Sequence, residues 1–174
     1  MRGHWAENYV DTLASMLIVN GNNGKFEPNK QITRAEFVTL IVNAFDFEKA
    51  GENPFKDVKS TDWFFDSVSI AYANGIATGS NGNFNPNNPI SREEMATMIV
   101  RVIDNIEPNK PVPMIYTTYT DEADISDWAS HSIQTASALK LVSGFDGLYR
   151  PKDSTTKAES ATVIFRLLDV LNTY

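Results

Sequence analysis

The sequence repeats one pattern three times. Each copy has a tryptophan, an aromatic residue 21 positions later, a proline two positions after that, and a basic residue six positions further on. These four positions are Trp5, Phe26, Pro28 and Arg34 in the first copy, Trp63, Phe84, Pro86 and Arg92 in the second, and Trp128, Tyr149, Pro151 and Lys157 in the third. One such unit cannot cover its own apolar faces, so the three copies must pack on each other. The spacing leaves a linear stack and a closed threefold cluster equally open.

Each copy predicts two helices joined by a glycine turn. The first helix is expected to begin at the tryptophan, with Asp62 and Asp127 as N-caps in the second and third copies. The turn reads Gly-x-x-Gly-x-aromatic-x-Pro over residues 21–28, 79–86 and 144–151, where the glycines suit backbone with positive φ and the proline stops a helix. The second helix opens with a capping box, a hydroxyl residue followed three positions later by glutamate, at 33–36, 91–94 and 156–159.

Apolar residues follow each capping box at helical spacing and are interpreted as core. The chain is therefore predicted to be all-α. Three helix-loop-helix repeats at residues 1–46, 54–104 and 119–174 are expected to form one compact module. The first residues belong to repeat material and carry no secretion signal, so the chain is expected to be part of a longer protein.

The most informative residues for function are the basic ones. Arg34, Arg92 and Lys157 each occupy the first position of a helix, where the helix dipole is positive and a cation costs about 0.3–1 kcal/mol. A cation beside free helix N–H groups and a glycine turn favours an anion site, and arginine can bind a carboxylate through two hydrogen bonds. A structural salt bridge to an acid such as Asp57 or Asp121 is the alternative, and the residues alone do not decide between the two.

Other features narrow the function. Trp5, Trp63 and Trp128 are interpreted as core or groove-wall residues, with sugar stacking as an alternative, and truncating Trp63 is expected to destabilise the fold. A net charge of −7 argues against non-specific nucleic-acid binding, and no apolar run reaches the length of a membrane span. His4 and His131 lack a second ligand at metal spacing, and no catalytic motif is present. No metal, cofactor or enzymatic activity is expected.

The combined pattern resembles the S-layer homology (SLH) module, in three tandem copies that cover nearly the whole chain. Residues 33–36, Thr-Arg-Ala-Glu, match the hallmark tetrapeptide of the family in full, whereas residues 91–94 keep the arginine and residues 156–159 replace it with lysine. An aromatic-x-Asp element precedes the second copy at 55–57 and, with one insertion, the third copy at 119–121. The first copy lacks this element, as expected if it is truncated at Met1.

The resemblance implies a pseudo-threefold, three-pronged spindle whose helices meet in a central bundle. It also implies a secreted, non-catalytic module of Gram-positive cell walls and S-layers, continuous with the rest of its parent protein. Grooves between repeats would bind a secondary cell-wall polysaccharide through a terminal pyruvylated N-acetylmannosamine. Arg34 and Arg92 would hold the pyruvate carboxylate, and Lys157 would do so more weakly. The other expected ligand-binding residues are Gly21, Gly79, Gly144, Asp57, Asp121, Trp5, Trp63 and Trp128.

Two alternatives to glycan anchoring remain. The first is a helical module whose grooves receive a protein segment. The second is a cell-wall hydrolase, which no feature of the sequence predicts.

Overall fold

The computed structural model describes residues 2–21, 25–47 and 51–172, and within these ranges it contains helices and no β-strand. The helices are α1 (Glu7–Ser15), α2 (Arg34–Ala44), α3 (Phe65–Ala73), α4 (Arg92–Ile106), the short 3-10 helix η1 (Glu122–Asp124), α5 (Asp127–Ala138) and α6 (Lys157–Val170). The predicted all-α class is confirmed for this part of the chain.

The second helix of each repeat begins where the capping box predicts. At the start of α2, the Glu36 backbone N–H donates to the Thr33 hydroxyl over 3.2 Å, and the Thr33 N–H donates to the Glu36 carboxylate over 2.8 Å. The same reciprocal pair starts α4 and α6, between Ser91 and Glu94 and between Thr156 and Glu159. These bonds satisfy backbone donors that a helix start would otherwise leave unpaired.

The first helices do not begin at the tryptophans as predicted. α1 and α3 start two residues after Trp5 and Trp63, and α5 starts one residue before Trp128. Asp62 does not cap α3. Its carboxylate instead accepts a hydrogen bond from the Lys59 N–H, in the turn that precedes the helix. Asp127 is the first residue of α5, after Ser126 at the cap position, and neither α3 nor α5 has a side-chain cap.

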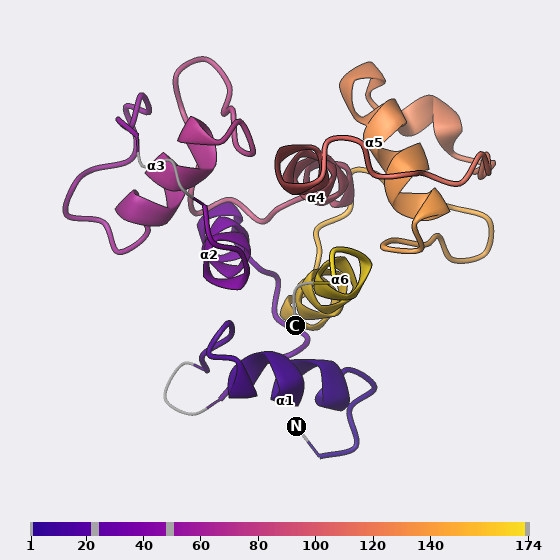
Figure 1. Cartoon of the computed structure of the whole chain (residues 1–174), viewed down its shortest axis with the longest axis horizontal. Helices are drawn as coiled ribbons and strands as arrows, with labels where there is room; N and C mark the ends of the chain where they lie inside the picture. The colour runs from indigo at the N-terminus through magenta and orange to yellow at the C-terminus, as the bar shows by residue number, and fades with distance from the viewer. Residues whose placement is uncertain (1, 22–24, 48–50, 173–174) are drawn as a thin grey trace.

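The helices form an inner and an outer set. Figure 1 shows α2, α4 and α6 around the centre of the molecule, with α1, α3 and α5 outside them. Each outer helix packs against the inner helix of the preceding repeat: α3 against α2, α5 against α4, and α1 against α6. Each packed pair therefore consists of the second helix of one repeat and the first helix of the next repeat. The contact between the first and last helices joins the third repeat to the first.

Backbone hydrogen bonds at the centre show the same closure. The N–H of Ile32 donates to Thr155, that of Thr155 to Ile90, and that of Ile90 to Ile32, over 3.0–3.1 Å. Each repeat thus contributes one residue to a three-membered ring of bonds. The repeats form a closed cluster, which decides between the two packings that the sequence left open. The spindle-shaped outline implied by the family resemblance stays a prediction.

The aromatic residues before the turn prolines of the second and third repeats are core residues, whereas Phe26 of the first repeat is partly buried. Phe84 and Tyr149 are both fully buried, and their rings pack on Phe55 at 5.5 Å and on Tyr119 at 5.2 Å between centroids. The aromatic-x-Asp element therefore supplies a ring that packs on the turn of its own repeat.

These rings also explain two of the glycines. A Cβ at Gly79 would lie 2.4 Å from the Phe55 ring, and a Cβ at Gly144 would lie 2.7 Å from the Tyr119 ring. Gly79 also has a φ of +63°, as the sequence predicts. Gly144 and Gly21 do not have positive φ, so for them that prediction is wrong, and close approach is the reason for glycine at Gly144. Gly24 lies outside the described residues.

Candidate functional site

Three grooves of similar size lie between the repeats. The Arg34 groove has a volume of about 400 Å³, the Arg92 groove about 390 Å³ and the Lys157 groove about 370 Å³, which is within the range of small-ligand sites. The Arg34 groove includes Arg34, Gly79, Glu94, Arg101 and Trp128. The Arg92 groove includes Arg92, Gly144, Glu159, Arg166 and Trp5. The Lys157 groove includes Lys157, Gly21, Glu36, Asn43 and Trp63.

The composition of the grooves follows from the ring closure. Each groove takes its hallmark basic residue from one repeat, its glycine turn from the next, and its tryptophan from the remaining one. Nine of the eleven predicted site residues, all except Asp57 and Asp121, therefore come together in three equivalent places. The sequence predicts these residues but does not reveal that every groove needs all three repeats.

Arg34 is held firmly by the second repeat. Its Nε donates to the backbone carbonyl of Phe84 over 2.8 Å, and its Nη1 donates to Glu94 Oε1 over 2.5 Å. The guanidinium carbon lies 4.9 Å from the centre of the Phe84 ring. Only 8% of Arg34 is exposed. Within the described part of the chain, Nη2 is the one nitrogen of the guanidinium group without a hydrogen bond.

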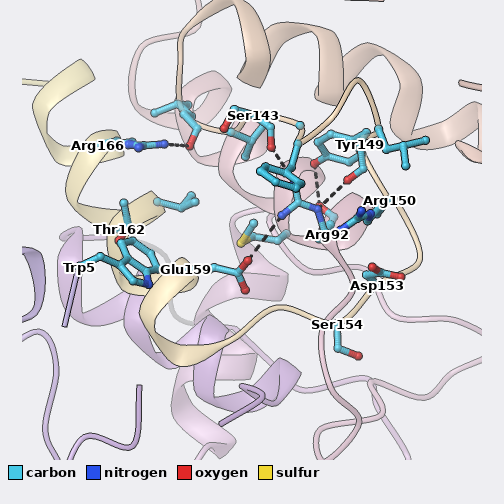
Figure 2. Close-up of a pocket in the computed structure, with 17 residues that line it drawn as sticks. Trp5, Arg92, Ser143, Tyr149, Arg150, Asp153, Ser154, Glu159, Thr162 and Arg166 are labelled. Carbon is cyan, nitrogen blue, oxygen red and sulfur yellow. Dashed lines mark hydrogen bonds and ion pairs between the residues drawn. The ribbon is translucent and has the colours of Figure 1, made fainter. Parts of the chain in front are cut away.

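Arg92 makes the corresponding contacts to the third repeat (Figure 2). Its Nε and Nη2 donate to the carbonyls of Tyr149 and Ser143, each over 2.8 Å, and its guanidinium carbon lies 4.8 Å from the Tyr149 ring centre. The Glu159 carboxylate is 3.9 Å from Nη1. Lys157 completes the set more simply, because among the residues that the structure describes its Nζ pairs with Glu36 alone, at 3.1 Å.

These contacts revise the salt-bridge alternative. Each basic residue does face an acid, but this acid is the capping-box glutamate of the next repeat and not Asp57 or Asp121. The pairing of Arg34 with Glu94 is not apparent from the sequence, because the two residues are 60 positions apart. Glu36, Glu94 and Glu159 therefore have two structural roles: each caps its own helix and neutralises the cation of a neighbouring repeat.

The predicted free N–H groups at the helix starts are not free. The Arg34 N–H donates to the carbonyl of Asn88 over 2.9 Å, and the Ala35 N–H donates to that of Pro86 over 3.0 Å. The N–H of the third helical residue, Glu36, donates to the Thr33 hydroxyl. The same pattern holds at α4 and α6. The prediction of an anion held by helix N–H groups is therefore wrong, because the proline turn of the next repeat already supplies their acceptors. Within the described residues, the first three N–H groups of α2, α4 and α6 are therefore not available to an anion.

Asp57 and Asp121 hold the glycine turns. The two carboxylate oxygens of Asp57 accept the N–H groups of Phe84 and Asn85 over 2.8 and 2.7 Å, and Asp121 accepts the equivalent pair in the third repeat over 2.8 and 2.6 Å. Neither aspartate lines the groove beside its turn. Direct contact of either with a ligand stays a prediction.

The hydrogen bonds affect the ionisation of Asp121. Partial desolvation favours the neutral acid, but bonds from the N–H groups of Tyr149 and Arg150, together with the positive charge of Arg150, outweigh it and lower the pKa of Asp121 below its ordinary value. A carboxylate whose folded-state pKa is depressed stabilises the fold above its unfolded pKa, near 3.9. That stabilisation disappears as the pH falls through the lowered pKa.

We therefore expect Asp121→Asn to lower the free energy of unfolding at pH 7 by about 1–2 kcal/mol, because an amide cannot accept both N–H groups as a charged carboxylate does. The difference from the wild type should shrink between pH 4 and pH 2. Urea unfolding across this range measures both effects. Asp146→Asn, in the same turn, is the matched control and should leave the stability unchanged. A constant difference at all pH values would contradict the assigned role.

The tryptophans line grooves and are not core residues. Trp5, Trp63 and Trp128 are 60%, 66% and 56% exposed, and each lies in a groove formed with the two other repeats. Of the two positions that the sequence leaves open, core and groove wall, the structure shows the groove wall, and this exposure removes the reason for expecting that truncation of Trp63 destabilises the fold. The neighbouring Phe64, at the N-cap of α3, is the buried residue, 6% exposed.

A further set of groove residues was missed in the sequence. Asn43, Arg101 and Arg166 each lie nine positions after the hallmark basic residue and line the Lys157, Arg34 and Arg92 grooves respectively. Their common spacing is the only signal that could have revealed them. It is easily overlooked, because a polar residue on an amphipathic helix is ordinarily a solvent-facing one.

Comparison with known proteins now identifies the family. The model of the S-layer homology domain matches residues 1–38, 54–96 and 118–161. The chain belongs to the S-layer homology domain family. These segments fall in the three repeats and contain their glycine turns and hallmark tetrapeptides, and each match ends within the second helix of its repeat, α2, α4 or α6.

Relatives carry this SLH region within much longer proteins. An amylopullulanase of Thermoanaerobacterium thermosulfurigenes is 37% identical over 97% of the chain, which covers 9% of that enzyme. An exoglucanase of Acetivibrio thermocellus is 34% identical over 99% of the chain and 16% of the enzyme. The surface-layer 125 kDa protein of Lysinibacillus sphaericus is 29% identical over 95% of the chain and 14% of that protein. The chain spans less than a fifth of each relative.

The family establishes the general role of the chain. SLH domains are cell-wall anchoring modules of S-layer and cell-surface proteins, and they bind cell-wall polymers. The domain is not catalytic, and the enzymes among the relatives match only through it. Across residues 2–21, 25–47 and 51–172, none of the helices has the length and apolar character needed to cross a membrane.

Proposed function

We propose that the chain anchors a larger surface protein to a Gram-positive cell wall by binding a pyruvylated secondary cell-wall polysaccharide. The terminal pyruvylated N-acetylmannosamine would enter the grooves between repeats. The pyruvate ketal would lie toward Arg34 or Arg92, and the sugar ring toward the exposed tryptophan. The observation that carries this proposal is the repeated combination of a basic residue, a tight glycine turn and an exposed indole in one groove.

The chemistry of the grooves suits this ligand. Exposed indoles bind the apolar face of a sugar ring, and a guanidinium group can hold a carboxylate. In an acidic chain with a net charge of −7, the Arg34 groove gathers two arginines against a single glutamate. Figure 2 shows the corresponding Arg92 groove, with Trp5 and Arg92 on either side of Glu159. The local field thus opposes the overall charge of the protein at the place where an anion would bind.

The strength of anchoring would come from several grooves acting together. One charge-assisted hydrogen bond contributes about 1.5–3 kcal/mol, which is not sufficient for tight binding. Two or three grooves engaged by neighbouring polymer ends raise the effective affinity without new contacts. The Lys157 groove is expected to be the weakest, because lysine presents a point charge without the planar fork with which arginine binds a carboxylate.

Calorimetry with purified wall polymer tests the proposal. The chain should bind pyruvylated polymer and lose most of its affinity for the same polymer after the pyruvate is removed by mild acid. A double variant, Trp5→Ala and Trp128→Ala, should bind at least about tenfold more weakly while unfolding at the same temperature, because both indoles are exposed. Equal binding of pyruvylated and pyruvate-free polymer by the wild type would refute the assignment and favour a protein ligand.

A further inference from the structure

The residue nine positions after each hallmark basic residue makes an equivalent contact in all three repeats. Asn43 donates its side-chain N–H to the carbonyl of Ile18, over 3.4 Å. Arg101 and Arg166 donate Nη1 to the equivalent carbonyls in their own repeats, Ile76 over 3.2 Å and Leu141 over 3.3 Å. All three acceptors lie just after the first helix of a repeat. The shared structural role is therefore to tie the second helix to the end of the first.

This role does not require a charge. The neutral amide of Asn43 fulfils it in the first repeat, where it ties α2 to the end of α1. An arginine at the same position adds a positive charge and further donors that the contact does not use. The second and third repeats therefore carry cations whose charge the fold does not explain.

These cations differ from the hallmark arginines in being uncompensated. Arg34 shares its charge with Glu94 at 2.5 Å, so the pair contributes little net field to its groove. Arg101 adds only a hydroxyl contact, to Thr78 over 3.4 Å, and Arg166 has its one bond to a backbone carbonyl. Within the described residues neither forms an ion pair. Burial lowers the pKa of Arg101, yet a guanidinium stays charged at any physiological pH.

We propose that Arg101 and Arg166 are the residues that make the Arg34 and Arg92 grooves select an anionic ligand. The hallmark arginines, fixed by glutamate and by the carbonyls of the next repeat, shape the groove and offer it few free donors. The second arginine supplies the net charge that a carboxylate needs. The Lys157 groove has Asn43 at this position and accepts sugars without discriminating by charge. This inference rests on the proposed function, since it names the residues that determine specificity at the same grooves.

The first repeat supplies the variants for the test. Arg101→Asn with Arg166→Asn copies the natural Asn43 and keeps the contact to the helix end. The reciprocal variant, Asn43→Arg, adds the missing charge to the Lys157 groove. Two probes separate charge from shape: the monosaccharide pyruvylated N-acetylmannosamine, and the methyl ester of its pyruvate carboxylate. Calorimetry of each protein with each probe gives an acid-to-ester affinity ratio and a number of sites.

The double asparagine variant should lose at least about tenfold in affinity for the acid, the equivalent of one charge-assisted hydrogen bond. It should keep its affinity for the ester and unfold at the wild-type temperature. Asn43→Arg should add a site that prefers the acid. If the wild type prefers the acid and both variants keep its ratio and site number, the inference is overturned and the proposed function stands. If the wild type does not prefer the acid, the proposed function fails, and the inference fails with it.

Discussion

Phe84→Ala is expected to lower the free energy of unfolding by about 3–5 kcal/mol, the usual cost of truncating a buried aromatic residue. Phe84 is fully buried. Its ring packs on Phe55 and lies beside the guanidinium of Arg34, so its loss leaves a cavity where two repeats meet. The variant should therefore weaken the packing of the first repeat on the second as well as the glycine turn itself.

Trp63→Ala is the matched control for this prediction, because it removes a larger ring from an exposed position in the same repeat. We expect its unfolding free energy to change by less than about 1 kcal/mol. Guanidinium unfolding monitored by circular dichroism measures both variants. A loss of several kcal/mol for Trp63→Ala, or none for Phe84→Ala, would contradict the burial on which the description of the grooves depends.

Arg34→Ala should also destabilise the fold strongly, by about 3 kcal/mol. It removes a bond to a backbone carbonyl, a close ion pair and a ring contact, and it leaves the Glu94 carboxylate and the Phe84 carbonyl without partners. Lys157→Ala should cost about 1 kcal/mol or less. Among the described residues its Nζ contacts Glu36 alone and lacks the carbonyl bond and the ring contact of Arg34, although the two ion pairs are about equally exposed.

Arg34→Lys separates charge from geometry in this comparison. Lysine keeps the ion pair but cannot also donate to the Phe84 carbonyl, so its stability should fall between those of the wild type and the alanine variant. The same unfolding measurement applies. If Arg34→Ala were as stable as Lys157→Ala, the arginine would be a surface residue available to a ligand, contrary to its 8% exposure.

The sequence predicts those parts of the fold that are set by local contacts. The capping boxes and glycine turns are local, and a capping glutamate finds its partner three residues away, so their positions could be read directly. The first helices have no such cap, and their starts at Glu7 and Phe65 were misplaced. The closure of the ring depends on contacts such as Ile32 with Thr155, which no local pattern contains.

The sequence predicts the residue types that line the candidate site, but it does not predict how residues from different repeats combine to form each groove. The repeated basic, glycine and tryptophan positions do gather in grooves. The ion pair of Arg34 with Glu94 could not be foreseen, because it joins two repeats that the sequence presents as equivalent. For the tryptophans the sequence leaves a core and a groove-wall position open, because a bulky aromatic residue is ordinarily buried and a groove shared by three repeats is visible only after they are packed.

The staggered closure makes the module indivisible. Because every groove draws its cation, its turn and its indole from three different repeats, a shortened protein with two repeats would have no complete groove, rather than two of three. If the grooves bind as proposed, the number of binding sites cannot be adjusted by adding or deleting single repeats. It would change in whole modules of three, or by point substitutions such as Asn43→Arg that alter one groove.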